Sequence, residues 1–71
     1  MTDKEWKELC EWAKTLVKSY VITLDVYEDY FVLRKHRGIV DIHRKGLIDF
    51  GCWKSENRTP AQMKAIIENL L

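Results

Sequence analysis

The 71-residue sequence contains only two cysteines, three glycines and one proline. The cysteines, Cys10 and Cys52, permit one bridge at most, which excludes the disulfide framework typical of small secreted domains. Each lies in an apolar pattern, where a reduced thiol packs as a small hydrophobic group. We therefore expect two buried free thiols and a reducing, cytoplasmic environment.

Long apolar runs and an excess of one charge are also missing. No stretch approaches the roughly 20 apolar residues of a membrane span, and the charged start MTDKEWKELCEW lacks the apolar core of a signal peptide. Twelve Lys and Arg residues against eleven Asp and Glu leave a net charge of +1. This balance excludes a global attraction to nucleic acid or anionic lipid, so any nucleic-acid contact must be local. We expect no membrane association.

Motifs that carry well-known chemistries are absent as well. The chain has no Gly-rich phosphate loop, no HExxH, no CxxC and no nucleophile elbow. His36 or His43 could serve a small nuclease as a general base, and the two histidines with the two cysteines could be combined into a zinc site. A histidine in a charged turn is usually only exposed, and this scattered spacing lacks the paired ligands of a zinc motif. We expect no enzyme, no metal and no cofactor.

The remaining composition is that of an ordinary globular domain. Hydrophobic residues make up 46% and charged residues 32% of the chain, which is far from the disordered regime. We expect one small α+β domain over residues 1–71. A core of this size is marginal, because a domain of about 60 residues buries only about 60% of its unfolded surface. Partner subunits often stabilise such domains, so a homo-oligomer is expected.

Two capping-box patterns predict the helices, one at each end of the chain. Thr2–Glu5 predicts a helix over about residues 3–18, and Thr59–Gln62, with Pro60 at the first helical position, predicts a second helix to the C-terminus. Apolar residues recur at helical spacing in both. They are Trp6, Leu9, Cys10, Ala13, Leu16 and Val17 in the first helix and Met63, Ile66, Ile67, Leu70 and Leu71 in the second.

Between the helices the apolar period changes to two, which predicts four strands. The segments are 20–27, 30–34, 39–43 and 47–53. Gly38 and Gly46 each precede a strand and follow basic residues, a pattern typical of hairpins with a left-handed glycine. The predicted fold is helix, four-stranded antiparallel β-meander, helix (αββββα).

The turn at Gly46 also predicts a register. It places His43 opposite Leu47 and Asp41 opposite Asp49, and like charges directly across an antiparallel pair are destabilising. The two aspartates are either solvated and neutralised by Lys35 or Lys54, or matched by basic groups of a partner. A third alternative is a divalent cation or a shared proton.

Several apolar residues are left over once the core face is assigned. Strand parity places them on the opposite face: Val21, Tyr27, Ile39, Leu47 and Trp53, with Phe31 and Leu33 ambiguous. If both helices cover one face, these residues form an exposed patch of the kind that marks interaction sites. If one helix covers each face, the domain has three layers and no patch. Trp12 and Trp53 are the expected anchors, and the apolar strand 47–53 is an expected edge for dimerisation.

A basic run, 34-RKHRGIVDIHRKG-46, raises a nucleic-acid alternative. A meander would divide it between opposite ends of one strand, with Glu28 and Asp29 beside the second group and no acidic neighbour in view beside the first. Phosphate contacts would then come from Arg34, Lys35, Arg37, Arg44 and Lys45.

These patterns favour a non-enzymatic protein-binding module, a regulator or inhibitor of a size that suits a phage accessory protein. The expected binding residues are Trp12, Ile39, Asp41, Leu47, Asp49 and Trp53. The alternatives are a small nucleic-acid-binding domain that uses the basic turns and a small nuclease that uses a turn histidine.

Overall fold

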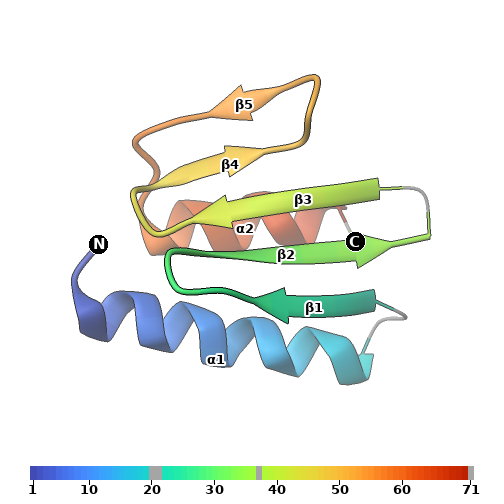
Figure 1. The fold of residues 1–71 in the computed structure, drawn as a ribbon, viewed down its shortest axis with the longest axis horizontal. Coiled ribbons are helices and arrows are strands. Elements are labelled where there is room, and N and C mark those ends of the chain that lie inside the picture. The colour runs from blue at the N-terminus through green and yellow to red at the C-terminus, as the bar shows by residue number, and fades with distance from the viewer. Residues whose placement is uncertain (20–21, 37, 71) are drawn as a thin grey trace.

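The computed structural model describes residues 1–19, 22–36 and 38–70. Its elements are α1 (Asp3–Ser19), β1 (Ile22–Val26), β2 (Tyr30–Lys35), β3 (Gly38–His43), β4 (Leu47–Asp49), β5 (Lys54–Ser55) and α2 (Pro60–Leu70), as Figure 1 shows. The predicted α+β class and αββββα order are confirmed, with a short fifth strand added. The expectations for Tyr20, Val21, Arg37 and Leu71 lie outside the described residues.

Reciprocal capping boxes start both helices, as predicted. The Glu5 N–H donates to the Thr2 hydroxyl at 3.1 Å, and the Thr2 N–H donates to the Glu5 carboxylate at 3.0 Å. The Thr2 backbone N–H, with help from the hydroxyl, holds the pKa of the Glu5 carboxyl below its usual value. At α2 the Gln62 N–H donates to the Thr59 hydroxyl at 3.2 Å, and the Thr59 N–H donates to the Gln62 side-chain carbonyl at 2.9 Å. Each box satisfies amide groups that have no partner within the helix.

The strands form one antiparallel sheet in the order β1-β2-β3-β4-β5. Gly46 adopts a φ of 96° between β3 and β4, and its N–H donates to the His43 carbonyl at 3.0 Å. This is the left-handed turn that the sequence predicts, and the register that follows from it pairs Asp41 with Asp49. A Cβ at position 46 would meet the Arg58 carbonyl oxygen at 3.0 Å, which is a second reason for glycine there.

The predicted length of the last strand, residues 47–53, was wrong. It ends at Asp49, and a turn through Gly51, with a φ of 88°, leads into β5. The Phe50 N–H donates to the Trp53 carbonyl at 2.8 Å and closes this hairpin. Strand β4 is therefore paired on both sides, and the edge that we expected to support dimerisation is covered by β5.

Both helices pack on the same face of the sheet. One continuous core joins the buried stripe of α1, the buried residues of α2 and one face of β1–β4. In Figure 1, α1 runs along β1 and α2 lies behind β2 and β3, while β4 and β5 extend beyond α2. Phe31 and Leu33, whose face was ambiguous, belong to this core at 0% and 3% exposure. The domain therefore has two layers, and the three-layer alternative was wrong.

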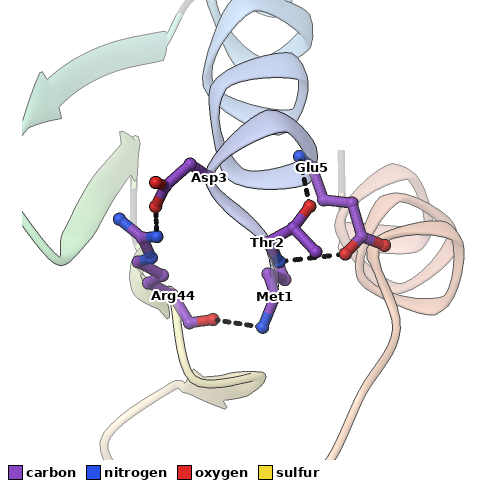
Figure 2. Close-up of polar contacts among 5 residues, drawn as sticks. All are labelled: Met1, Thr2, Asp3, Glu5 and Arg44. Atoms are coloured by element: carbon purple, nitrogen blue, oxygen red, sulfur yellow. Dashed lines mark hydrogen bonds and ion pairs between the residues drawn. The ribbon is translucent and has the colours of Figure 1, made fainter.

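The N-terminus is tied to the turn between β3 and β4, as Figure 2 shows. The Met1 ammonium donates to the Arg44 carbonyl at 3.5 Å, and the Arg44 guanidinium pairs with the Asp3 carboxylate. The Arg44 N–H also donates to the Asp29 carbonyl at 2.8 Å. These contacts join the start of α1, the β1–β2 turn and the β3–β4 turn at one end of the sheet.

Candidate protein-binding face

We call the side of the sheet that points away from the helices the outer face. Register fixes its residues because partners opposite each other point to the same side. They are Thr23 and Asp25 of β1, Tyr30, Val32 and Arg34 of β2, Ile39, Asp41 and His43 of β3, Leu47 and Asp49 of β4 and Lys54 of β5. Both described helices lie on the opposite side.

An acidic row crosses the middle of the outer face. Successive strands place Asp25, Val32, Asp41, Asp49 and Lys54 side by side in one line. Val32 is only 6% exposed although it does not belong to the core beneath the helices. In the row, Val32 lies between Asp25 of β1 and Asp41 of β3. At the centre of the outer face, acidic residues thus surround a valine that is almost completely buried.

The two paired aspartates differ in what neutralises them. Asp49 accepts the Gly51 N–H at 2.7 Å and lies 3.8 Å from the Lys54 ammonium. Asp41 makes no hydrogen bond or ion pair with any other residue that the structure describes. Lys35, the other expected neutralising residue, lies on the helix side, because it pairs with Ile22 and Gly38. Asp41 therefore presents a carboxylate that this part of the chain leaves unmatched.

Beside the acidic row lies a column of stacked rings. Tyr27 stacks on Tyr30 with 4.7 Å between ring centroids, and Tyr30 stacks on His43 at 5.3 Å. Leu47 pairs with His43 and extends the column onto β4. Sequence reasoning missed Tyr30 and His43 as members of this face. The register at Gly46 already placed His43 opposite Leu47, but the β1–β2 turn left the face of Tyr30 unassigned.

The expected binding residues do not all lie on the outer face. Ile39 is there and 58% exposed, and Leu47 is there and half-buried. The Trp53 ring lies 4.9 Å from the ring of Phe50, which packs against the core on the helix side, so the outer-face assignment of Trp53 was wrong. Trp12 is half-buried on the helix side, with the Lys64 ammonium 5.7 Å from its ring centroid.

The first basic cluster, residues 34–37, contains a cation that is already paired with an acidic side chain. The Arg34 guanidinium lies 3.4 Å from the Asp25 carboxylate, so the expectation that no acidic neighbour is near it was wrong. Lys35 points to the helix side, away from Arg34. Arg37 lies outside the described residues. Arg34, Lys35 and His36 nevertheless border one hollow at this end of the sheet, where Arg34 is already paired with Asp25.

The second basic cluster lies at the other end of β3. Arg44 is engaged by Asp3, and Lys45 is exposed in the turn. Asp29 borders the same hollow as His43 and both basic residues, so the predicted acidic neighbour is present. The two basic clusters are separated by the length of β3, as the meander predicts.

The cysteines and histidines do not meet. Cys10 is buried and Cys52 is exposed, so the expectation of two buried thiols was wrong for Cys52. Burial raises the pKa of the Cys10 thiol. Within residues 1–19, 22–36 and 38–70, no group of three His, Cys, Asp or Glu side chains is placed to hold a metal ion.

Comparison with known proteins gives no relative for this chain. No family model, curated protein or solved structure matches it. Of the helices that the structure describes, neither has the length and apolar character needed to cross a membrane.

Proposed function

We propose that the protein is a non-enzymatic protein-binding module that receives its partner on the outer face of the sheet. The observation that carries the proposal is the Asp41 carboxylate. It lies at the centre of the face that the helices leave open and has no neutralising group among the described residues. A carboxylate so placed is well suited to accept a charge-assisted hydrogen bond from another molecule.

The surroundings of Asp41 favour an arginine of the partner. A guanidinium can bind a carboxylate through two parallel N–H groups and can also stack on an aromatic ring. Asp41 and Asp49 offer acceptor oxygens, and the Tyr30–His43 pair offers ring surface one row away. Ile39, which is 58% exposed, supplies apolar contact on the same face. This combination supports an arginine flanked by apolar residues as the feature recognised.

A regulator or inhibitor that docks on a larger protein fits this proposal. Strand β4 does not offer a free edge for homodimerisation, because β5 pairs with it. Binding of nucleic acid is less favoured, because carboxylates line the face between the two separated basic turns. A small nuclease has no added support, since His43 is stacked on Tyr30 and His36 lies at the other end of β3.

Selection of peptides from a random library tests the proposal. We expect the wild-type protein to select peptides enriched in arginine beside apolar residues, and Asp41→Asn to select none of this class. In calorimetry, Asp41→Asn should weaken the best peptide about tenfold or more, since a hydrogen bond to a charged group contributes about 1.5–3 kcal/mol.

The matched control is Glu68→Gln, which removes an exposed acid from α2 on the helix side. It should leave peptide affinity unchanged. Selected peptides without basic residues, or equal affinity for wild type and Asp41→Asn, would contradict the proposal. Capture of oligonucleotides in place of peptides, with affinity that falls steeply as salt rises, would favour the basic turns.

A further inference from the structure

The helix side of the sheet contains an apolar cavity. It measures about 310 Å³ and opens at the end of the sheet where β2 passes to β3. Its apolar walls include Ile22, Leu33, Val40, Phe50, Ile67 and Leu70. The cavity is within the range of volumes, about 300–1,000 Å³, that is typical of small-molecule sites.

The cavity has a closed base and an open mouth. Helix α2 lies behind β2 and β3, and the β4–β5 hairpin extends beyond it (Figure 1). Phe50, at the base of that hairpin, is only half-buried, and Leu70 near the end of α2 is 49% exposed. Deeper in the cavity, Leu33 and Ile67 are 3% and 1% exposed. Packed side chains therefore close the base, and solvent reaches the mouth.

Gly38 leaves one position in the wall of the cavity without a side chain. It pairs with Lys35 on the helix side of the sheet and lines the cavity. A Cβ at position 38 would meet no atom of a described, non-adjacent residue within 4 Å, whereas a Cβ at Gly46 would meet the Arg58 carbonyl oxygen at 3.0 Å. Crowding therefore does not account for this glycine. Glycine weakens a strand, and it often marks a position that a ligand approaches closely.

The cavity offers no unmatched charge from the described residues to an occupant. None of those that line it is Asp, Glu or Arg, and its one lysine, Lys35, already has an interaction partner within the chain. Arg34 lies on the outer face beside Asp25. Transfer of a charged group into an apolar site without a partner is strongly unfavourable. A matching occupant is therefore uncharged.

Two of the lining residues carry aromatic rings. Phe50 forms part of the apolar wall, and His36 lies at the exposed mouth. Contacts between aromatic rings contribute about 0.5–1.5 kcal/mol beyond the area that they bury. From this arrangement we infer that the cavity binds a small uncharged aromatic compound. The site lies on the opposite side of the sheet from Asp41 and goes beyond the proposed function.

An NMR titration of the ¹⁵N-labelled protein with indole tests the inference. A water molecule takes about 30 Å³ of liquid volume, so 310 Å³ corresponds to roughly ten groups of that size, which matches indole. We expect saturable shifts confined to the walls and mouth of the cavity. Indole-3-carboxylate and tryptamine, which add a negative or a positive charge to the same ring, should each bind about tenfold more weakly or worse. Equal or tighter binding of either charged analogue, shifts centred on the outer face, or no saturation at about 1 mM indole would overturn the inference.

N-acetyltryptophanamide separates a free compound from a side chain of a protein partner. It presents the same ring together with two amide groups, which the cavity volume does not accommodate. It should therefore bind more weakly than indole. Tighter binding would assign the cavity to a tryptophan of a partner and overturn the inference.

Substitutions at the mouth provide the matched variants. Gly38→Val fills the open position and should weaken indole about tenfold or more without lowering the thermal midpoint, because valine favours strands. Ala65→Val adds apolar bulk at an exposed position of α2 and should leave the affinity unchanged. Leu70→Ala removes part of the exposed wall and should weaken indole about fivefold. Unchanged affinity in Gly38→Val would overturn the inference, and if that variant loses stability, unchanged affinity in Leu70→Ala would do so.

Discussion

The two faces of the sheet contain similar apolar residues but use them differently. On β3, Ile42 faces the helices and is 0% exposed, whereas Ile39, three residues earlier, lies on the outer face and is 58% exposed. The helix side buries Phe31 and Ile48 completely as well. The outer face instead places two aspartates opposite each other. The comparison teaches that one face specifies the fold, which leaves the other free to hold charges that contribute little to stability.

The largest expected difference is between the reaction rates of the two thiols, because Cys10 is buried and Cys52 is exposed. Cys52 is exposed in the β4–β5 turn and should react with DTNB in the native protein. Cys10 is buried against the core, and its raised pKa also disfavours the reactive thiolate. If global opening costs about 5 kcal/mol, Cys10 should react about a thousandfold more slowly or slower still. Comparable native rates for both cysteines would show that α1 is not packed as described.

Truncation of the two isoleucines on β3 measures the same contrast in stability. Ile42→Ala should lower the free energy of unfolding by about 2–5 kcal/mol, because it leaves a cavity among residues of both helices. Ile39→Ala should change it by about 0.5 kcal/mol or less, since the side chain is mostly in water. Urea titrations of both variants check this difference. Similar losses would mean that the outer face contributes a core of its own.

The smallest expected effect is the difference in stability between Asp→Asn substitutions at the two paired aspartates. Asp41→Asn removes a like-charge contact without losing a partner among the described residues, so it should stabilise the free protein by a few tenths of a kcal/mol. Asp49→Asn relieves the same repulsion but weakens the contacts with Gly51 and Lys54, so it should give no net gain. The midpoints of thermal unfolding, with Glu68→Gln as the charge control, resolve the two. A gain for Asp49→Asn alone would contradict the assigned partners.

The parts of the fold that the sequence predicted depend on local chemistry. Each capping box needs only residues three positions apart, so the start of each helix could be placed without tertiary information. The left-handed Gly46 turn likewise fixed the register, and with it the opposition of Asp41 and Asp49. These features follow from short-range geometry, and for that reason they were predictable.

The wrong face assignments arose where the alternation of side chains along a strand was extended through a turn that had not been recognised. Gly51 and Cys52 form the tip of a hairpin, so alternation no longer holds beyond them, and Trp53 returns to the side of Phe50. The same turn exposes Cys52, which an unbroken strand would have buried on one face. The Arg34–Asp25 pair was missed for a different reason, because it joins neighbouring strands and depends on the β1–β2 register.

The meander has a consequence for how the chain finds its structure. Every strand pairs with the strand next to it in sequence, so the sheet can grow through short hairpins without closing a long loop. Segments distant along the chain are brought together by the packing of the helices on the sheet, as in the contact of Trp6 with Phe31, and by the links from Met1 and Asp3 to Arg44. Pairing between sequence neighbours keeps the contacts within the sheet local, which favours rapid formation of the sheet. The outer face, which only the sheet builds, would then be assembled from local contacts before the two helices need to meet.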